Sequence, residues 1–138
     1  MSIEKISKEL AWQLRHEVMW PDKPLDYVKL TDDDAGVHYG LFEEGKLLSV
    51  VSLFLKGPEA QFRKFATKKN EQGKGHGSRL LAHVLEEART AGAKRIFCNA
   101  RSEKAPFYEK FGLLKTEEEF EKGGKRYVVM EKAGEKEQ

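Results

Sequence analysis

Cysteine is almost absent from this sequence of 138 residues: Cys98 stands alone, and there is no cluster of cysteine and histidine residues. A lone cysteine cannot form an intramolecular disulfide, and the usual spacings of metal-ligand motifs are missing. We therefore expect a fold without a disulfide and a site without a metal. Cysteine usage of this kind is typical of a cytoplasmic protein.

Long hydrophobic runs and a strong excess of charge are absent too. No apolar stretch approaches the roughly 20 residues that a membrane-spanning helix needs, and residues 1–5 do not begin a signal peptide. The net charge is only +2, whereas nucleic-acid-binding domains ordinarily carry a strong basic patch. We expect neither a membrane nor a nucleic acid as a partner.

What is present is the composition of a globular protein, with 39% hydrophobic and 35% charged residues. In the first half, Ile6, Leu10, Leu14 and Val18 recur every four residues, which predicts an amphipathic helix that ends before Pro21. Alternating apolar residues predict strands further on. The elements expected in this half are a helix over residues 4–19, a polar stretch over 22–36, and strands over 37–42, 47–55 and 61–67.

In the second half of the sequence, predicted helices and strands alternate. Gly92 and Gly112 stand where glycine commonly ends a helix, and Ser102 is a candidate N-cap. The elements expected here are helices over residues 77–91 and 102–111, and strands over 94–100, 113–120 and 125–131. We expect one domain over residues 1–131, followed by a charged, disordered tail over 132–138.

The order of these elements predicts an α/β fold with a mixed, mostly antiparallel sheet and helices on both of its faces. The strand–helix–strand segment in the middle makes strands 61–67 and 94–100 a parallel pair, because such crossovers join parallel neighbours. The hairpins on either side add antiparallel strands.

The most informative segment is a glycine-rich loop, Gln72-Gly73-Lys74-Gly75-His76-Gly77-Ser78, between a strand and a helix. Glycines at every second position let the backbone turn sharply and approach a ligand closely. The first unpaired N–H groups of the following helix point toward whatever occupies the turn. The loop is therefore predicted to bind an anion, such as a phosphate.

Known phosphate loops differ in spacing. No window here fits the ATP-binding pattern, which needs a glycine, four intervening residues and then Gly-Lys-Ser/Thr. The dinucleotide pattern would need glycine or alanine in place of Ser78 and an acidic residue after the next strand, which ends in Cys98-Asn99-Ala100. A nicotinamide-binding module is thus a weaker alternative.

A third pattern, Gln/Arg-x-x-Gly-x-Gly/Ala, fits Gln72, Gly75 and Gly77 without adjustment. Downstream, Phe107-Tyr108-Glu109-Lys110-Phe111-Gly112 matches a second signature, a helix that ends in Tyr-Glu-Lys-x-Gly. Through these two motifs, their separation and the order of elements, residues 37–131 resemble the GNAT superfamily of acyl-CoA-dependent N-acyltransferases.

The resemblance implies that the two parallel strands splay apart at their ends and admit acetyl-CoA as co-substrate. Pantetheine would pair with the backbone of the first strand, and the pyrophosphate would rest on the glycine loop. The cofactor-binding residues implied are Phe65, Ala66, Thr67, Gln72, Gly73, Lys74, Gly75, His76, Gly77, Ser78, Asn99 and Tyr108. Two departures stand out: Arg101 and Lys104 replace an Asn and an Ala that are common in the family, and His76, expected to face solvent, replaces an aliphatic residue.

The resemblance also implies that Tyr108 is the catalytic general acid that protonates the departing thiolate. No general base is assigned; the candidates are His16, Glu17, His38 and Glu59. Cys98 lies in an apolar strand without an adjacent base, so we expect it to be a packing residue.

The function expected is transfer of acetyl from acetyl-CoA to a primary amine, by direct attack in a ternary complex. The acceptor, a small molecule or a peptide, is not identified by any motif. A non-catalytic acyl-CoA sensor or interaction module is the alternative. We expect Asp32–Asp34 to be a solvated acidic loop, although it could attract a cationic acceptor. The resemblance also implies that Arg15 and Tyr39 could line the acceptor pocket. Exposed edge strands would allow a homodimer.

Overall fold

The computed structural model describes residues 1–134. The helices are α1 (Lys8–Met19), α2 (His76–Thr90) and α3 (Ala105–Glu109), and the short 3-10 turns are η1 (Leu25–Val28), η2 (Asp33–Ala35), η3 (Lys69–Glu71) and η4 (Ser102–Lys104). The strands are β1 (Ser2–Ile6), β2 (Val37–Glu43), β3 (Lys46–Lys56), β4 (Glu59–Thr67), β5 (Arg95–Arg101), β6 (Leu114–Lys122) and β7 (Lys125–Ala133).

The hydrogen-bonded order of the strands is β1-β2-β3-β4-β5-β7-β6. The pairs β1–β2, β2–β3, β5–β7 and β6–β7 are antiparallel, whereas β4 and β5 are parallel and pair from Glu59–Arg95 to Gln61–Phe97. The α/β class, the mostly antiparallel sheet and the parallel pair are confirmed.

The contacts within the chain define two compact units. The N-terminal unit consists of residues 1–54 and 62–86, and the C-terminal unit consists of residues 55–61 and the chain from Glu87 onward. The glycine loop and the second half of β4 therefore belong to the N-terminal unit, and Asn99 and Tyr108 belong to the C-terminal unit. A single domain over 1–131 stays a prediction.

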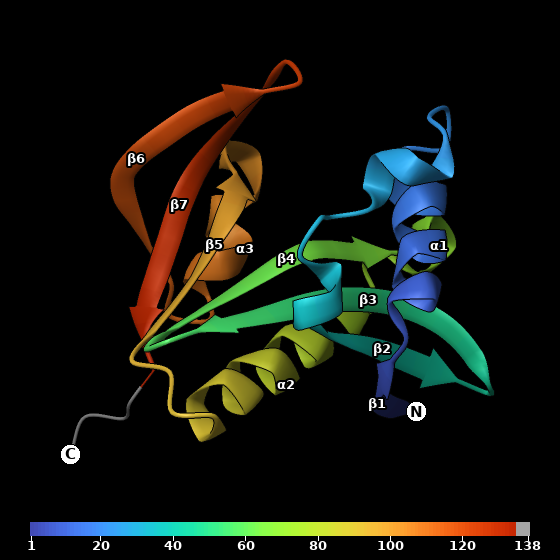
Figure 1. Cartoon of the computed structure of the whole chain (residues 1–138), viewed down its shortest axis with the longest axis horizontal. Helices are drawn as coiled ribbons and strands as arrows, with labels where there is room; N and C mark the ends of the chain where they lie inside the picture. The colour runs from blue at the N-terminus through green and yellow to red at the C-terminus, as the bar shows by residue number, and fades with distance from the viewer. Residues whose placement is uncertain (135–138) are drawn as a thin grey trace. The chain divides into compact units, whose positions relative to one another are not determined.

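In the N-terminal unit, α1 and α2 cover opposite faces of the strands (Figure 1). Leu14 of α1 packs with Val50 of β3 and Ala66 of β4. Tyr39 of β2, which pairs with Val51, instead contacts His83 of α2, with ring centroids 5.4 Å apart. Because successive residues of a strand point to opposite faces, these two contacts place the helices on either side.

In the C-terminal unit, β5 pairs with β7 along its whole length, from Arg95–Ala133 to Arg101–Tyr127. β6 and β7 form a hairpin, seen in orange and red in Figure 1, whose turn Gly123–Gly124 has positive φ angles of 60° and 79°. Side chains would be strained at both positions, which explains the two glycines.

The N-terminal helix begins later than predicted. Residues 2–6 form β1, which pairs antiparallel with β2 from Ser2–Phe42 to Ile6–His38. Ser7 is the N-cap of α1, because its side-chain oxygen accepts a hydrogen bond from the Leu10 N–H at 3.2 Å. Ile6 fits the period of the helix, but tertiary pairing decides its conformation.

Two other boundaries differ from expectation. Ser102 opens the turn η4 and not a helix, and α3 begins only at Ala105, without a side-chain cap at Lys104. β7 continues to Ala133, so Lys132 and Ala133 belong to a strand and not to a disordered tail. Residues 135–138 of the predicted tail lie outside the described residues. Among residues 1–134, we find no helix of sufficient length and hydrophobicity to span a membrane.

Candidate functional site

The glycine loop follows β4 and leads directly into α2. Gly73 and Gly75 have φ angles of +81° and +85°, and a Cβ added at either position would meet no atom within 4 Å. Glycine is thus required for backbone conformation and not for space, since other residues rarely adopt positive φ. The exposed surface of the loop is open to a ligand.

The loop ends at the start of α2, where backbone N–H groups lack partners within the helix. The first hydrogen bond of α2 runs from the Arg79 N–H to the Gly75 carbonyl, at 3.1 Å. The N–H groups of residues 76–78 precede it, so the helix itself offers them no acceptor. Together with the positive end of the helix dipole, they can bind an anion.

The predicted residues Gln72 and Thr67 contact each other. The Gln72 side-chain amide donates to the Thr67 carbonyl at 3.0 Å, which fastens the loop to the end of β4. Upstream, Lys64 has a left-handed φ of +58°, which interrupts the regular strand before Phe65. A Cβ at Gly77 would lie 3.4 Å from the Phe65 ring, so loop and strand pack closely here.

His76 is buried, with 4% of its surface exposed, so the prediction that it faces solvent is wrong. Its Nε2 lies 3.1 Å from Oε1 of Glu71, and its Nδ1 is buried without a hydrogen-bond partner. Lys74 Nζ lies 3.4 Å from the same Glu71 oxygen. The hydrogen bond from His76 is the main reason why the pKa of Glu71 lies below its usual value.

Glu71 and His76 also belong to a group that could accept a cation. With Glu43 they place one potential ligand atom each within 4.8 Å of one another. Two carboxylates and an imidazole are a donor set that divalent metals accept. Here His76 and Lys74 already contact Oε1 of Glu71.

The predicted residues of the C-terminal unit lie on β5 and α3. Asn99 is exposed on β5, and Tyr108 on α3 is partly buried. Burial and the neighbouring Cys98 both raise the pKa of Tyr108 above its usual value, so the phenol keeps its proton at neutral pH. Cys98 is 2% exposed, which confirms it as a packing residue in the core, and burial raises its pKa to about 12.

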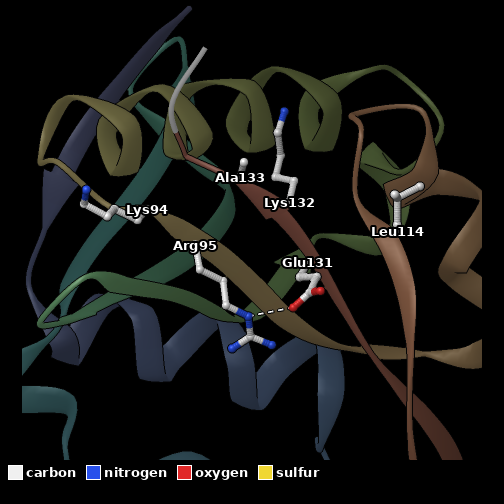
Figure 2. A pocket seen from close by; sticks show the side chains of 6 residues that line it. All are labelled: Lys94, Arg95, Leu114, Glu131, Lys132 and Ala133. Atoms are coloured by element: carbon white, nitrogen blue, oxygen red, sulfur yellow. Dashed lines mark hydrogen bonds and ion pairs between the residues drawn. The ribbon is translucent and has the colours of Figure 1, made fainter. Parts of the chain in front are cut away.

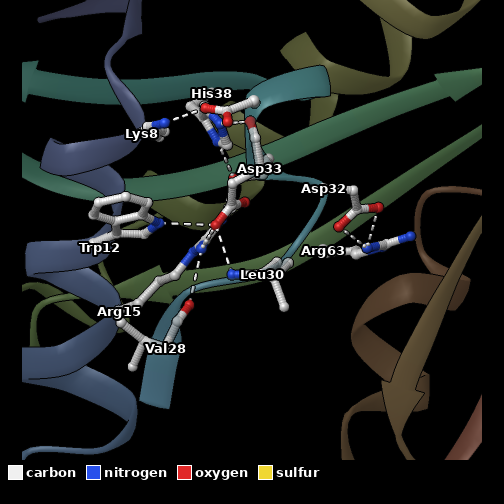
Figure 3. A network of polar contacts seen from close by, with 11 residues as sticks. Lys8, Trp12, Arg15, Val28, Leu30, Asp32, Asp33, His38 and Arg63 are labelled. Carbon is white, nitrogen blue, oxygen red and sulfur yellow. Dashed lines mark hydrogen bonds and ion pairs between the residues drawn. The ribbon is translucent and has the colours of Figure 1, made fainter. Parts of the chain in front are cut away.

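A buried polar network, which the sequence did not reveal, lies in the N-terminal unit (Figure 3). Arg15 donates from Nη1 to Oδ2 of Asp33 at 2.9 Å and from Nη2 to Oδ1 at 3.1 Å. Trp12 Nε1 and the Leu30 N–H also donate to Asp33, each at 2.8 Å. Burial alone would raise the pKa of Asp33, but the hydrogen bonds from Arg15, Trp12 and Leu30 outweigh it and lower the pKa.

His38 completes this network. Its Nε2 lies 3.0 Å from the Asp33 carbonyl oxygen, which can only accept, so Nε2 carries a proton. In the neutral imidazole, Nδ1 then accepts from the Ser52 hydroxyl at 2.6 Å, while Ser52 Oγ accepts from Arg15 Nη2 at 2.8 Å. Because both ring nitrogens are used, the structure argues against His38 as a general base.

The expectation of a solvated acidic loop is wrong for Asp33, which is 2% exposed, and Arg15 is fully buried and cannot line a pocket. Asp32 and Asp34 pair with Arg63 and Lys8. These ion pairs neutralise the acidic stretch, which weakens the case for attraction of a cationic acceptor.

A separate cavity of about 340 Å³ lies in the C-terminal unit (Figure 2). Arg95 in its wall donates to Glu131 at 2.7 Å and to Glu59 at 3.1 Å. The ion pair with Arg95 engages the carboxylate of Glu59, which the sequence suggested as a candidate general base. The cavity is lined by Lys94, Arg95, Leu114, Glu131, Lys132 and Ala133, none of which the sequence singled out as cofactor-binding.

Comparisons with known proteins identify a family for the chain. The sequence model of the acetyltransferase (GNAT) domain family matches residues 7–133. An uncharacterized N-acetyltransferase of Bacillus subtilis, YitI, is 27% identical over 142 residues, covering 96% of this chain and 95% of that protein.

Solved structures of acetyltransferases have the same fold. An aminoglycoside 6'-N-acetyltransferase complexed with coenzyme A is 14% identical with a TM-score of 0.80, covering 100% of this chain and 99% of the other. A GNAT family acetyltransferase from Elizabethkingia anophelis with acetyl-CoA bound is 16% identical with a TM-score of 0.75, covering 96% and 97%.

Proposed function

The chain belongs to the GNAT acetyltransferase family, and from this premise we propose that it transfers acetyl from acetyl-CoA to a primary amine in a ternary complex. The family membership makes it an acyl-CoA-dependent N-acetyltransferase in general terms. The proposal adds the residues that bind the co-substrate, the residue that protonates the leaving group, and direct transfer. The acceptor is a small molecule or a peptide.

One observation carries the proposal: two left-handed glycines, Gly73 and Gly75, precede the open N–H groups at the start of α2. This backbone suits a pyrophosphate, which carries negative charge and several acceptor oxygens. We propose that residues 72–78 bind the pyrophosphate of acetyl-CoA and that the backbone of residues 65–67 pairs with pantetheine. Relatives with coenzyme A or acetyl-CoA bound support this choice of ligand.

Direct transfer needs a neutral amine, donors for the tetrahedral oxyanion, and a proton for the departing sulfur. The amine nitrogen attacks the thioester carbon and loses one proton to solvent water, the C–S bond breaks, and Tyr108 gives its hydroxyl proton to the sulfur and regains one from solvent. Tyr108 can supply this proton because a phenol is protonated at neutral pH, although burial raises its pKa and so makes the transfer less favourable. A backbone N–H at Phe65 or Ala66 would donate to the oxyanion. Asn99 is proposed as a further cofactor contact.

The test is an assay of the purified protein with acetyl-CoA and a broad panel of primary amines, including polyamines, amino acids, aminoglycosides and peptides. CoA release and the acetylated product, identified by mass spectrometry, are measured together. We expect both in equal amounts with at least one amine class. Acetyl-CoA binding without transfer to any amine would favour a non-catalytic sensor.

A further inference from the structure

The side chain of His76 is buried at the first position of α2 and contacts Glu71. Because Glu71 and His76 are five residues apart, their contact joins the two ends of the segment that contains Gly73 and Gly75. Lys74 approaches the same Glu71 oxygen at 3.4 Å. The Glu71 carboxylate therefore contacts two residues of the loop, Lys74 and His76.

This contact matters because glycine-rich segments are flexible. Gly73 and Gly75 reach left-handed backbone without strain, but they also reach many other conformations, and fixing them costs entropy. A ligand that must order the loop pays this cost out of its binding free energy. A contact that orders the loop beforehand raises affinity without touching the ligand.

Packing alone does not explain a histidine here. The Nε2 group faces a carboxylate and thus carries a proton that it donates to Glu71 at 3.1 Å. The Nδ1 atom is buried without a hydrogen-bond partner, which is unfavourable. An aliphatic side chain would fill the same space without that cost, so the hydrogen bond to Glu71 is the property that distinguishes His76.

We infer that the Glu71–His76 contact is a latch that holds residues 72–75 in their anion-binding conformation, so that His76 is a positioning residue for acetyl-CoA. This inference rests on the proposed function, because it assumes that the loop binds the pyrophosphate. On the other side, the hydrogen bond from Gln72 to Thr67 ties the loop to β4. The Glu71–His76 contact and the Gln72–Thr67 hydrogen bond together hold both ends of residues 72–75.

The test compares His76→Leu, which fills the space but cannot donate, with His76→Gln, whose amide can still reach Glu71. Glu44→Gln is the control, since it removes one negative charge from the exposed β2–β3 turn outside the latch. Affinity for CoA is measured by calorimetry, and kcat and KM are measured with acetyl-CoA and with S-acetylpantetheine, which lacks the pyrophosphate.

For His76→Leu we expect about fivefold to tenfold weaker CoA binding and a matching rise in KM for acetyl-CoA, which corresponds to the loss of one hydrogen bond. Turnover of S-acetylpantetheine, which has no pyrophosphate to contact the loop, should fall less than turnover of acetyl-CoA, and a circular dichroism spectrum that matches the wild type shows that the variant is folded. His76→Gln should recover most of the affinity, and Glu44→Gln should match the wild type.

Wild-type affinity in His76→Leu, or equal losses with both acyl donors, would overturn the latch. If the wild-type protein itself bound no CoA, the proposed function would fail first, and the latch with it. The two failures are therefore told apart by the wild-type titration.

Discussion

Arg15 and Asp33 form a bidentate ion pair inside the N-terminal unit, with 0% and 2% of their surfaces exposed. Buried charges are costly unless they are paired and hydrogen-bonded, and here both oxygens of the carboxylate accept donors. Because Arg15 lies on α1 and Asp33 on η2, the pair fixes the segment between α1 and β2. Arg15 Nη1 also donates to the Val28 carbonyl at 3.0 Å, which holds η1.

Replacing Asp33 by Asn should strongly destabilise the protein. The amide cannot neutralise the buried guanidinium, and removing one partner of such a pair costs about 3–5 kcal/mol. Urea denaturation of the two proteins at neutral pH measures the difference. Asp26→Asn, which removes an exposed carboxylate paired with Lys29, is the control and should change the free energy of unfolding far less. Equal effects of the two substitutions would contradict the role given to Asp33.

The Arg15–Asp33 pair also predicts how the free energy of unfolding depends on pH. The pKa of Asp33 is lower in the folded protein than its unfolded value of about 3.9, so its contribution is complete above that value and is lost as the pH falls through the folded pKa. The free energies of unfolding of wild type and Asp33→Asn are measured by urea denaturation from neutral pH down to about pH 3. Their difference should stay constant down to about pH 4 and become smaller below it. A difference in free energy of unfolding that already becomes smaller near neutral pH would mean that a titratable group other than Asp33 is responsible.

Tyr108→Phe should lower kcat by about 10² to 10⁴ and leave KM for acetyl-CoA nearly unchanged, because the ring stays and only the proton donor is lost. Since the pKa of Tyr108 is raised, wild-type kcat should not fall on the alkaline side until well above pH 9. Steady-state kinetics over pH measure both effects. Undiminished turnover by the variant would remove Tyr108 from the mechanism.

Cys98 should be unreactive in the folded protein, because burial raises its pKa to about 12 and keeps the thiolate population very small. A thiol-reactive chromogenic disulfide should modify it slowly in buffer and fully in denaturant, and Cys98→Ser should retain transferase activity. Rapid modification of the native protein would show that the thiol is accessible.

The sequence predicted well those features that local chemistry decides. Gly73 and Gly75 take up the left-handed backbone that a glycine loop before a helix implies, and Gly123–Gly124 form the expected hairpin turn. The family followed from Gln72, Gly75, Gly77 and the Tyr108 motif, all of which are short and local.

Features that depend on distant partners were missed. Ile6 fits a helical period, yet pairing with His38 places it in β1. Among three consecutive aspartates, only contacts with Arg15 and Trp12, well separated in sequence, make Asp33 the buried one. His76 lies in a glycine-rich loop, so its burial depends on how α2 packs, which local pattern does not reveal.

The most direct test of the central claim is a calorimetric titration of acetyl-CoA into the wild-type protein and Gly75→Ala. We predict one saturable site per chain, and about fivefold to thirtyfold weaker binding by Gly75→Ala, because a non-glycine residue in left-handed backbone costs about 1–2 kcal/mol. NADH should not bind. Absence of acetyl-CoA binding at millimolar ligand, or unchanged affinity in Gly75→Ala, would contradict the assignment of this loop to the pyrophosphate.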